Sequence, residues 1–168
     1  AEWKWDGIRV QLVIDNDKAA IYSRTGDDIS LAFPDIIENL NGSAVLDGEL
    51  LVGKNFTPLE FNSLQQRLNR KKVIKKHLED YPAFVRVYDI LFDNETDVRA
   101  LPLIKRRDHL ENWFNKNKQS HLDISKHLKF SNWKDLEDIR IKGSDEYGHE
   151  GVMIKLKTSP YVPGRPKG

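Results

Sequence analysis

The stretch Glu2-Trp3-Lys4-Trp5-Asp6-Gly7-Ile8-Arg9 dominates the interpretation of this chain. Strand-like residues lie on both sides of the Asp6-Gly7 turn signal, so we predict that Lys4 lies at or beside a strand end, near a tight turn. Aromatic neighbours would remove water from the ammonium and favour the neutral amine, which is the nucleophilic form of lysine. Arg9 would act in the same direction as a like charge and can bind a phosphate. The alternative is an ordinary solvated lysine on a hairpin, with both tryptophans facing the core.

The composition indicates one globular domain. The chain has 168 residues, of which 39% are hydrophobic and 32% charged, and this is typical of a soluble protein with a real core. A net charge of +1 means that any nucleic-acid surface must be a local patch. The absence of cysteine excludes disulfides and thiol chemistry. We find no membrane-spanning apolar run or signal peptide, and expect a cytoplasmic protein.

Hydrophobic periodicity predicts strands interspersed with helices. The expected strands are 8–14, 19–24, 43–52, 84–92, 128–130 and 150–156. The expected helices are 34–40, 58–71 with a broken continuation to 78, 103–114, and 133–141 capped by Ser131 or Asn132. The order predicts an α+β fold with mainly antiparallel sheets.

Charged side chains interrupt two of the expected strands. Asp47-Gly48-Glu49 breaks an apolar run and Glu150 opens another. A buried glutamate is costly unless a ligand or partner satisfies it, so both fit a shared metal or ribose site. Asp47-Gly48-Glu49 alone also fits a turn between two short strands. Likewise, Tyr88 alone fits plain core and Lys155 alone fits a solvated strand face.

A basic stripe has two interpretations as well. It consists of Lys71, Lys72, Lys75, Lys76, Arg106 and Arg107. These side chains could face DNA, but solvated helix faces are the reading that we favour.

The segment Lys4-x-Asp6-Gly7-x-Arg9 resembles motif I of the covalent nucleotidyltransferases, which comprise DNA ligases, RNA ligases and mRNA capping enzymes. In that superfamily the lysine attacks the α-phosphate of a nucleotide and forms a lysyl-NMP phosphoramidate. The resemblance therefore implies that Lys4 is the catalytic nucleophile.

Five more segments resemble the same superfamily, in the expected order. They are Ser23-Arg24-Thr25-Gly26, Asp47-Gly48-Glu49-Leu50, Val87-Tyr88-Asp89-Ile90-Leu91, Glu150-Gly151-Val152-Met153-Ile154-Lys155 and the tail Ser159 to Gly168. The resemblance implies that Arg9 and Arg24 bind phosphate or ribose, and that Tyr88 stacks on adenine.

The same resemblance implies the remaining site residues and the cofactors. Glu49 would bind ribose and metal, Glu150 metal and Lys155 phosphate. Glu2 matches the position that reads the adenine amino group. ATP and Mg²⁺ or Mn²⁺ would be the cofactors.

Taken together, the segments look like the adenylation domain of an ATP-dependent DNA ligase, with bacterial members the most similar. The implied fold is ATP-grasp-like, with two mainly antiparallel sheets and flanking helices around a nucleotide cleft. We expect residues 1–168 to be a domain truncated at both ends, without the motif V lysines and the OB-fold domain. The expected partners are ATP and nicked double-stranded DNA, no membrane and no second subunit, in a bacterial, nucleoid-associated protein. An RNA ligase and a catalytically silent nucleic-acid-binding module are the alternatives.

Overall fold

The computed structural model describes residues 1–16, 18–68, 70, 72–117, 119–143 and 148–164. The strands are β1 Glu2–Trp5, β2 Ile8–Asp15, β3 Lys18–Ser23, β4 Ser43–Lys54, β5 Thr57–Pro58, β6 Ala83–Asp93, β7 Thr96–Asp97, β8 Leu122–Ile124 and β9 His149–Met153. The helices are α1 Pro34–Ile37, α2 Phe61–Gln65, α3 Lys75–Asp80, α4 Leu103–Lys116 and α5 Trp133–Lys142, with a 3₁₀ turn, η1, at Ser30–Ala32.

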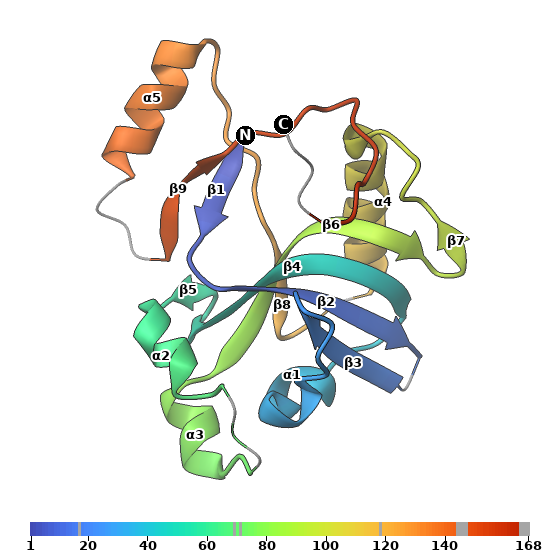
Figure 1. Ribbon diagram of the computed structural model, residues 1–168, viewed down its shortest axis with the longest axis vertical. Coiled ribbons are helices and arrows are strands. Elements are labelled where there is room, and N and C mark those ends of the chain that lie inside the picture. Colours follow the sequence, from blue (N-terminus) through green and yellow to red (C-terminus); the bar gives the residue numbers. More distant parts are fainter. Residues whose placement is uncertain (17, 69, 71, 118, 144–147, 165–168) are drawn as a thin grey trace.

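Two separate sheets make up the fold, as the sequence predicted. The large sheet has the order β3-β2-β4-β6-β7, with β5 added to β4 and β8 added to β6. All of its pairings are antiparallel except β6 with β8. The small sheet pairs β1 with β9, and Figure 1 shows it above the large sheet, next to α5.

The large sheet is curved around its core. Along β2 the side chains of Val10, Leu12 and Ile14 are buried, and β4 contributes Leu46 and Leu50 from the same face. This alternation arises because successive strand residues point to opposite faces. Helix α4 packs on β6 and places Leu110 and Trp113 in the core. On the other face, Arg9 of β2 and Asp47 and Glu49 of β4 line the site described below.

The Asp6-Gly7 turn signal does not form a hairpin. It links β1 in the small sheet to β2 in the large sheet, and the Asp6 amide donates to the Gly148 carbonyl over 2.9 Å. Glycine is required at position 7 because a Cβ there would lie 2.4 Å from the Leu50 carbonyl oxygen. The chain therefore passes close to β4 at Gly7, three residues after Lys4.

Several expected elements differ from those observed. The helix expected over 58–71 is wrong: Thr57–Pro58 pairs with β4, α2 is a single short helix, and α3 is separate. The buried Arg67 explains the break, because its guanidinium turns inward to Asp35 and to the carbonyls of Ala32 and Tyr81. Residues 69 and 71 of that expected helix lie outside the described residues.

The remaining differences are smaller. The strand expected at 128–130 is replaced by β8, which pairs in parallel with β6. The last strand, β9, ends at Met153, and α1 ends at Ile37. The cap of α5 is Asn132, whose side chain accepts from the Asp135 amide. The predicted tail lies outside the described residues from 165 onward.

Candidate active site

A cavity of about 750 Å³ lies between the small sheet, the large sheet and the segment that follows β9. Its lining includes every residue that the sequence assigned to the site, which are Glu2, Lys4, Arg9, Arg24, Glu49, Tyr88, Glu150 and Lys155. The volume is in the range of small-molecule and cofactor sites. The structure thus brings together side chains separated by up to 153 positions in the sequence, such as Glu2 and Lys155.

Lys4 lies on β1 and points to the neighbouring strand. Its Nζ forms an ion pair with Glu150 of β9, and its side chain is 45% exposed. The expectation that Trp3 and Trp5 wall off Lys4 is wrong, because alternate residues of a strand point to opposite faces. Trp3 stacks on His149 with 4.0 Å between ring centroids, and the Trp5 ring lies 4.0 Å from the Arg86 guanidinium.

Glu2 and Lys155 form a second ion pair across the same two strands. Lys155 Nζ donates to Glu2 Oε1 over 3.0 Å, and Nζ lies 4.4 Å from the ring centroid of Tyr88. Glu2 is only 3% exposed, and its Oε2 has no hydrogen-bond partner within the described part of the chain. A buried carboxylate oxygen without a partner is costly, so Oε2 can accept a donor from a ligand in the cavity.

Arg9 forms a third pair, on the polar face of the large sheet. Its Nε donates to Asp47 Oδ1 over 3.0 Å and its Nη2 to Asp47 Oδ2 over 2.6 Å. Asp47 raises the pKa of Arg9 above its usual value. The Asp47 carboxylate therefore balances the charge of Arg9, which we expected to act as a like charge beside Lys4. Asp47-Gly48-Glu49 is continuous strand rather than a turn.

The Glu49 carboxylate has neither a hydrogen bond nor an ion pair within the described residues. Burial and the neighbouring Asp47 carboxylate raise the pKa of Glu49 from 4.5 to about 7, against the opposing charges of Arg9 and Lys4. A nearby cation would stabilise its charged form. No cluster of three or more histidine, aspartate or glutamate side chains is placed to hold a metal among the residues that the structure describes. Glu49 and Glu150 nevertheless provide the oxygen ligands that suit a hard cation retaining several waters.

Tyr88 and Arg24 complete the predicted set. Burial raises the pKa of Tyr88 well above its usual value, with Asp47 and Glu49 acting in the same direction. Arg24 follows β3, is exposed, and also lines a second cavity of about 400 Å³ adjoining the first. Its guanidinium is therefore accessible from both cavities.

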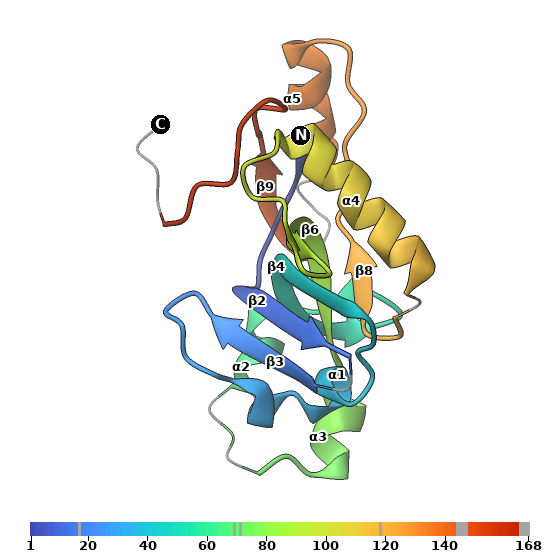
Figure 2. The same cartoon turned by 90° about the vertical axis from the view of Figure 1, so that its right-hand side faces the viewer.

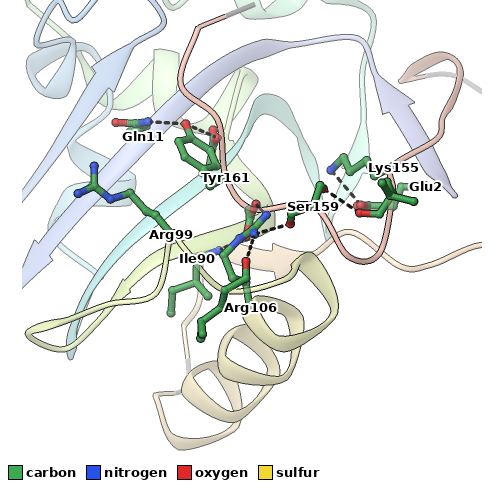
Figure 3. A network of polar contacts seen from close by, with 12 residues as sticks. Glu2, Gln11, Ile90, Arg99, Arg106, Lys155, Ser159 and Tyr161 are labelled. Carbon is green, nitrogen blue, oxygen red and sulfur yellow. Dashed lines mark hydrogen bonds and ion pairs between the residues drawn. The ribbon is translucent and has the colours of Figure 1, made fainter. Parts of the chain in front are cut away.

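Sequence reasoning missed the side chains that hold the segment after β9. Arg106 of α4, expected on a solvated face, is 3% exposed, and its Nε and Nη2 donate to Asp89 over 2.9 and 2.8 Å. Its Nη1 also donates to the carbonyls of Leu101 and Ser159 (Figure 3). Arg107 is buried too, so the solvated interpretation of both arginines is wrong. Two adjacent arginines near the start of an amphipathic helix were the only feature of the sequence that could have indicated this buried contact.

Comparison with known proteins identifies close similarity over the entire chain. The family model described as "ATP dependent DNA ligase domain" matches residues 1–168. A DNA ligase of Archaeoglobus fulgidus is 36% identical over 171 residues, covering 98% of this chain and 30% of that protein. A DNA ligase of Methanosphaera stadtmanae is 34% identical over 169 residues, covering 98% of this chain and 30% of that protein.

Solved structures show the same fold. The mycobacterial DNA ligase D complexed with ATP and MES aligns with a TM-score of 0.74 at 24% identity, over 98% of this chain and 50% of that chain. Chlorella virus DNA ligase-adenylate aligns with a TM-score of 0.68 at 17% identity, over 98% of this chain and 56% of that chain. Both curated relatives are archaeal, so they do not support the expected bacterial, nucleoid-associated origin. None of the described helices has the length and apolar character needed to cross a membrane.

Proposed function

Because the chain belongs to the family of ATP-dependent DNA ligase domains, we propose that it transfers AMP from ATP to Lys4 and then to the 5′-phosphate of nicked double-stranded DNA. The observation that carries this proposal is the single cavity in which Lys4 and every other predicted site residue meet. The names of the relatives favour DNA over RNA as the polynucleotide.

The first step is nucleophilic attack by Lys4. Its Nζ bonds to the α-phosphorus of ATP, the bond from that phosphorus to the bridging oxygen breaks, and pyrophosphate leaves. Lys4 must first leave Glu150 and lose a proton, because only the neutral amine is a nucleophile. The proton passes to water, which reaches the 45% exposed side chain.

The adenine would be held at the small-sheet end of the cavity. The buried Oε2 of Glu2 lacks a partner in the described structure and would accept from the exocyclic amino group. Tyr88 would stack on the base. The Lys155 ammonium now lies over that ring, so a base on the same face would displace it toward the phosphates.

Phosphates, ribose and metal would lie toward the large sheet. Arg9 and Arg24 would contact phosphate or ribose, and Glu49 the ribose. Glu49 and Glu150 would hold Mg²⁺ or Mn²⁺, whose charge would balance that of the triphosphate and the leaving pyrophosphate. A metal is consistent with the raised pKa of Glu49, because that carboxylate lacks a bonded cation in the described structure.

Nick sealing is proposed for the whole protein rather than for this chain. The chain spans 30% of the length of the curated relatives described above. We propose that residues 1–168 form the adenylation domain, that a further basic segment and an OB-fold domain complete pyrophosphate release and DNA binding, and that the protein acts as a monomer. Domain closure commonly completes a catalytic constellation, so an extended chain should adenylate faster without binding ATP much more tightly.

The test is to incubate the chain with ATP and Mg²⁺ and to map any AMP adduct by mass spectrometry. We expect an acid-stable adduct on the peptide containing Lys4, and none in Lys4→Ala. Lys18→Ala is the matched control, because Lys18 is exposed on β3 and is not among the residues that line the cavity. An adduct that persists in Lys4→Ala would overturn the assignment, and a chain that binds nucleic acid without any adduct would be a silent binding module.

A further inference from the structure

Tyr161 is the one side chain from the segment after β9 that reaches the Arg9–Asp47 pair in the described structure. Figure 3 shows its ring pointing from that segment onto β2, beside Gln11. The hydroxyl accepts from Arg9 Nη2 over 3.1 Å and from Gln11 Nε2 over 3.2 Å, and it donates to Asp47 Oδ2 over 3.3 Å. A tyrosine hydroxyl has one donor and two acceptor positions, so all three are used.

Backbone hydrogen bonds hold the segment that carries Tyr161. Its backbone amide donates to the Arg99 carbonyl over 2.8 Å. Two residues earlier, the Ser159 carbonyl accepts from the Leu103 amide at the start of α4 and from Arg106. Figures 1 and 2 show this segment leaving β9 and passing the start of α4. Contacts outside the large sheet therefore hold the Tyr161 hydroxyl against the polar face of that sheet.

The register of the sheet shows what the hydroxyl achieves. Arg9 on β2 lies directly opposite Glu49 on β4, and Gln11 lies directly opposite Asp47. Opposite charges in directly facing positions attract, since their Cβ atoms lie about 5 Å apart. Arg9 instead makes its bidentate contact with the diagonal residue, Asp47. The Tyr161 hydroxyl bonds both members of this diagonal pair and the residue facing Asp47.

We propose that Tyr161 is a positioning residue whose hydroxyl keeps Arg9 on Asp47 and so leaves Glu49 available to a nucleotide in the cavity. The proposal rests on the proposed function for its link to ATP. Without the hydroxyl, Arg9 loses an acceptor, and the facing Glu49 carboxylate competes for its guanidinium. An Arg9–Glu49 pair would occupy Glu49, which is the one of the two β4 carboxylates, Asp47 and Glu49, that has no ionic partner within the described residues.

The test compares Tyr161→Phe with a matched control, Tyr22→Phe. Tyr22 also lines the second cavity, and its hydroxyl has no hydrogen-bond partner in the part of the chain that the structure describes. The first readout is the Arg9 Nε–H signal in a ¹H–¹⁵N spectrum of the nucleotide-free chain, assigned with Arg9→Lys. We expect Tyr161→Phe to shift this signal and Tyr22→Phe to leave it in place. An unchanged signal in Tyr161→Phe would overturn the positioning role.

The second readout is ATP affinity by calorimetry. Tyr161→Phe should weaken binding by about two- to tenfold, the range for one hydrogen bond. It should cause no further loss in a Glu49→Gln background, because residues that act through one group are not additive. Equal losses in both backgrounds, or unchanged affinity, would overturn the link to Glu49. A wild-type chain that binds no ATP would instead contradict the proposed function, while the Arg9 signal would still decide the positioning role.

Discussion

Replacing Glu49 by glutamine should stabilise the fold in a pH-dependent way. Burial and Asp47 raise the pKa of this carboxyl from 4.5 to about 7. The folded state therefore holds a proton that the unfolded state has lost between these values, and stability falls as the pH rises through this window. Since one pKa unit corresponds to about 1.4 kcal/mol, the buried charge costs at most about 3 kcal/mol above the folded-state pKa.

Urea unfolding of the metal-free and nucleotide-free chain measures this cost. Glu49→Gln should gain less than about 1 kcal/mol near pH 5 and up to about 3 kcal/mol near pH 8, because the amide has no charge to bury. Glu38→Gln is the control, since Glu38 is exposed at the end of α1. An equal gain at both pH values, or no gain, would refute the reasoning. A gain together with weaker, still measurable ATP binding is expected where function requires a strained site.

Two further changes test the proposed base-binding side chain, Tyr88, and the buried pair of Arg106 and Asp89. Tyr88→Ala should weaken ATP binding by about 1–3 kcal/mol, the range for base–aromatic stacking, and Tyr88→Phe should be nearly neutral because the ring carries the effect. Calorimetry that finds both variants equally damaged would exclude stacking. Arg106→Met should lower the free energy of unfolding by about 3–5 kcal/mol, because it leaves the Asp89 carboxylate buried without its cation. Adding Asp89→Leu should recover part of that loss in urea unfolding, and no recovery would show that the pair is not the cause.

Local patterns in the sequence were sufficient to predict most strands, and the residues predicted for the site all line one cavity. The run from Ile8 to Ile14 predicted a strand, and the structure buries Val10, Leu12 and Ile14 on one face of β2 because strand side chains have a period of two. Arg9 and Glu49, together with Lys4 and Glu150, were assigned from short motifs, and the structure places them on strands that border one cavity. Such motifs are local, so they can be read without tertiary information.

Pairings between distant charges were not readable in the same way. Helical spacing over Phe61 and Leu68 predicted one long helix, but the buried Arg67 bonds Asp35 and interrupts it. The sequence around Arg106 predicted a solvated side chain, but Arg106 pairs with Asp89, which lies on β6. Charge patterns along a chain show which groups are present and not which of them meet, because the pairing depends on how the sheets and helices are stacked.

Three of the four cationic side chains assigned to the site already have carboxylate partners in the nucleotide-free chain. Lys4 pairs with Glu150, Lys155 with Glu2, and Arg9 with Asp47. A bare triphosphate would have to take these cations from their carboxylates and leave the carboxylates beside its own negative charge. A metal-bound nucleotide avoids part of this repulsion, because the metal can take the carboxylates while the lysines turn to the phosphates. The ion pairs therefore favour exchange with a nucleotide that carries its own cation, and they hold Lys4 on Glu150 until that exchange occurs.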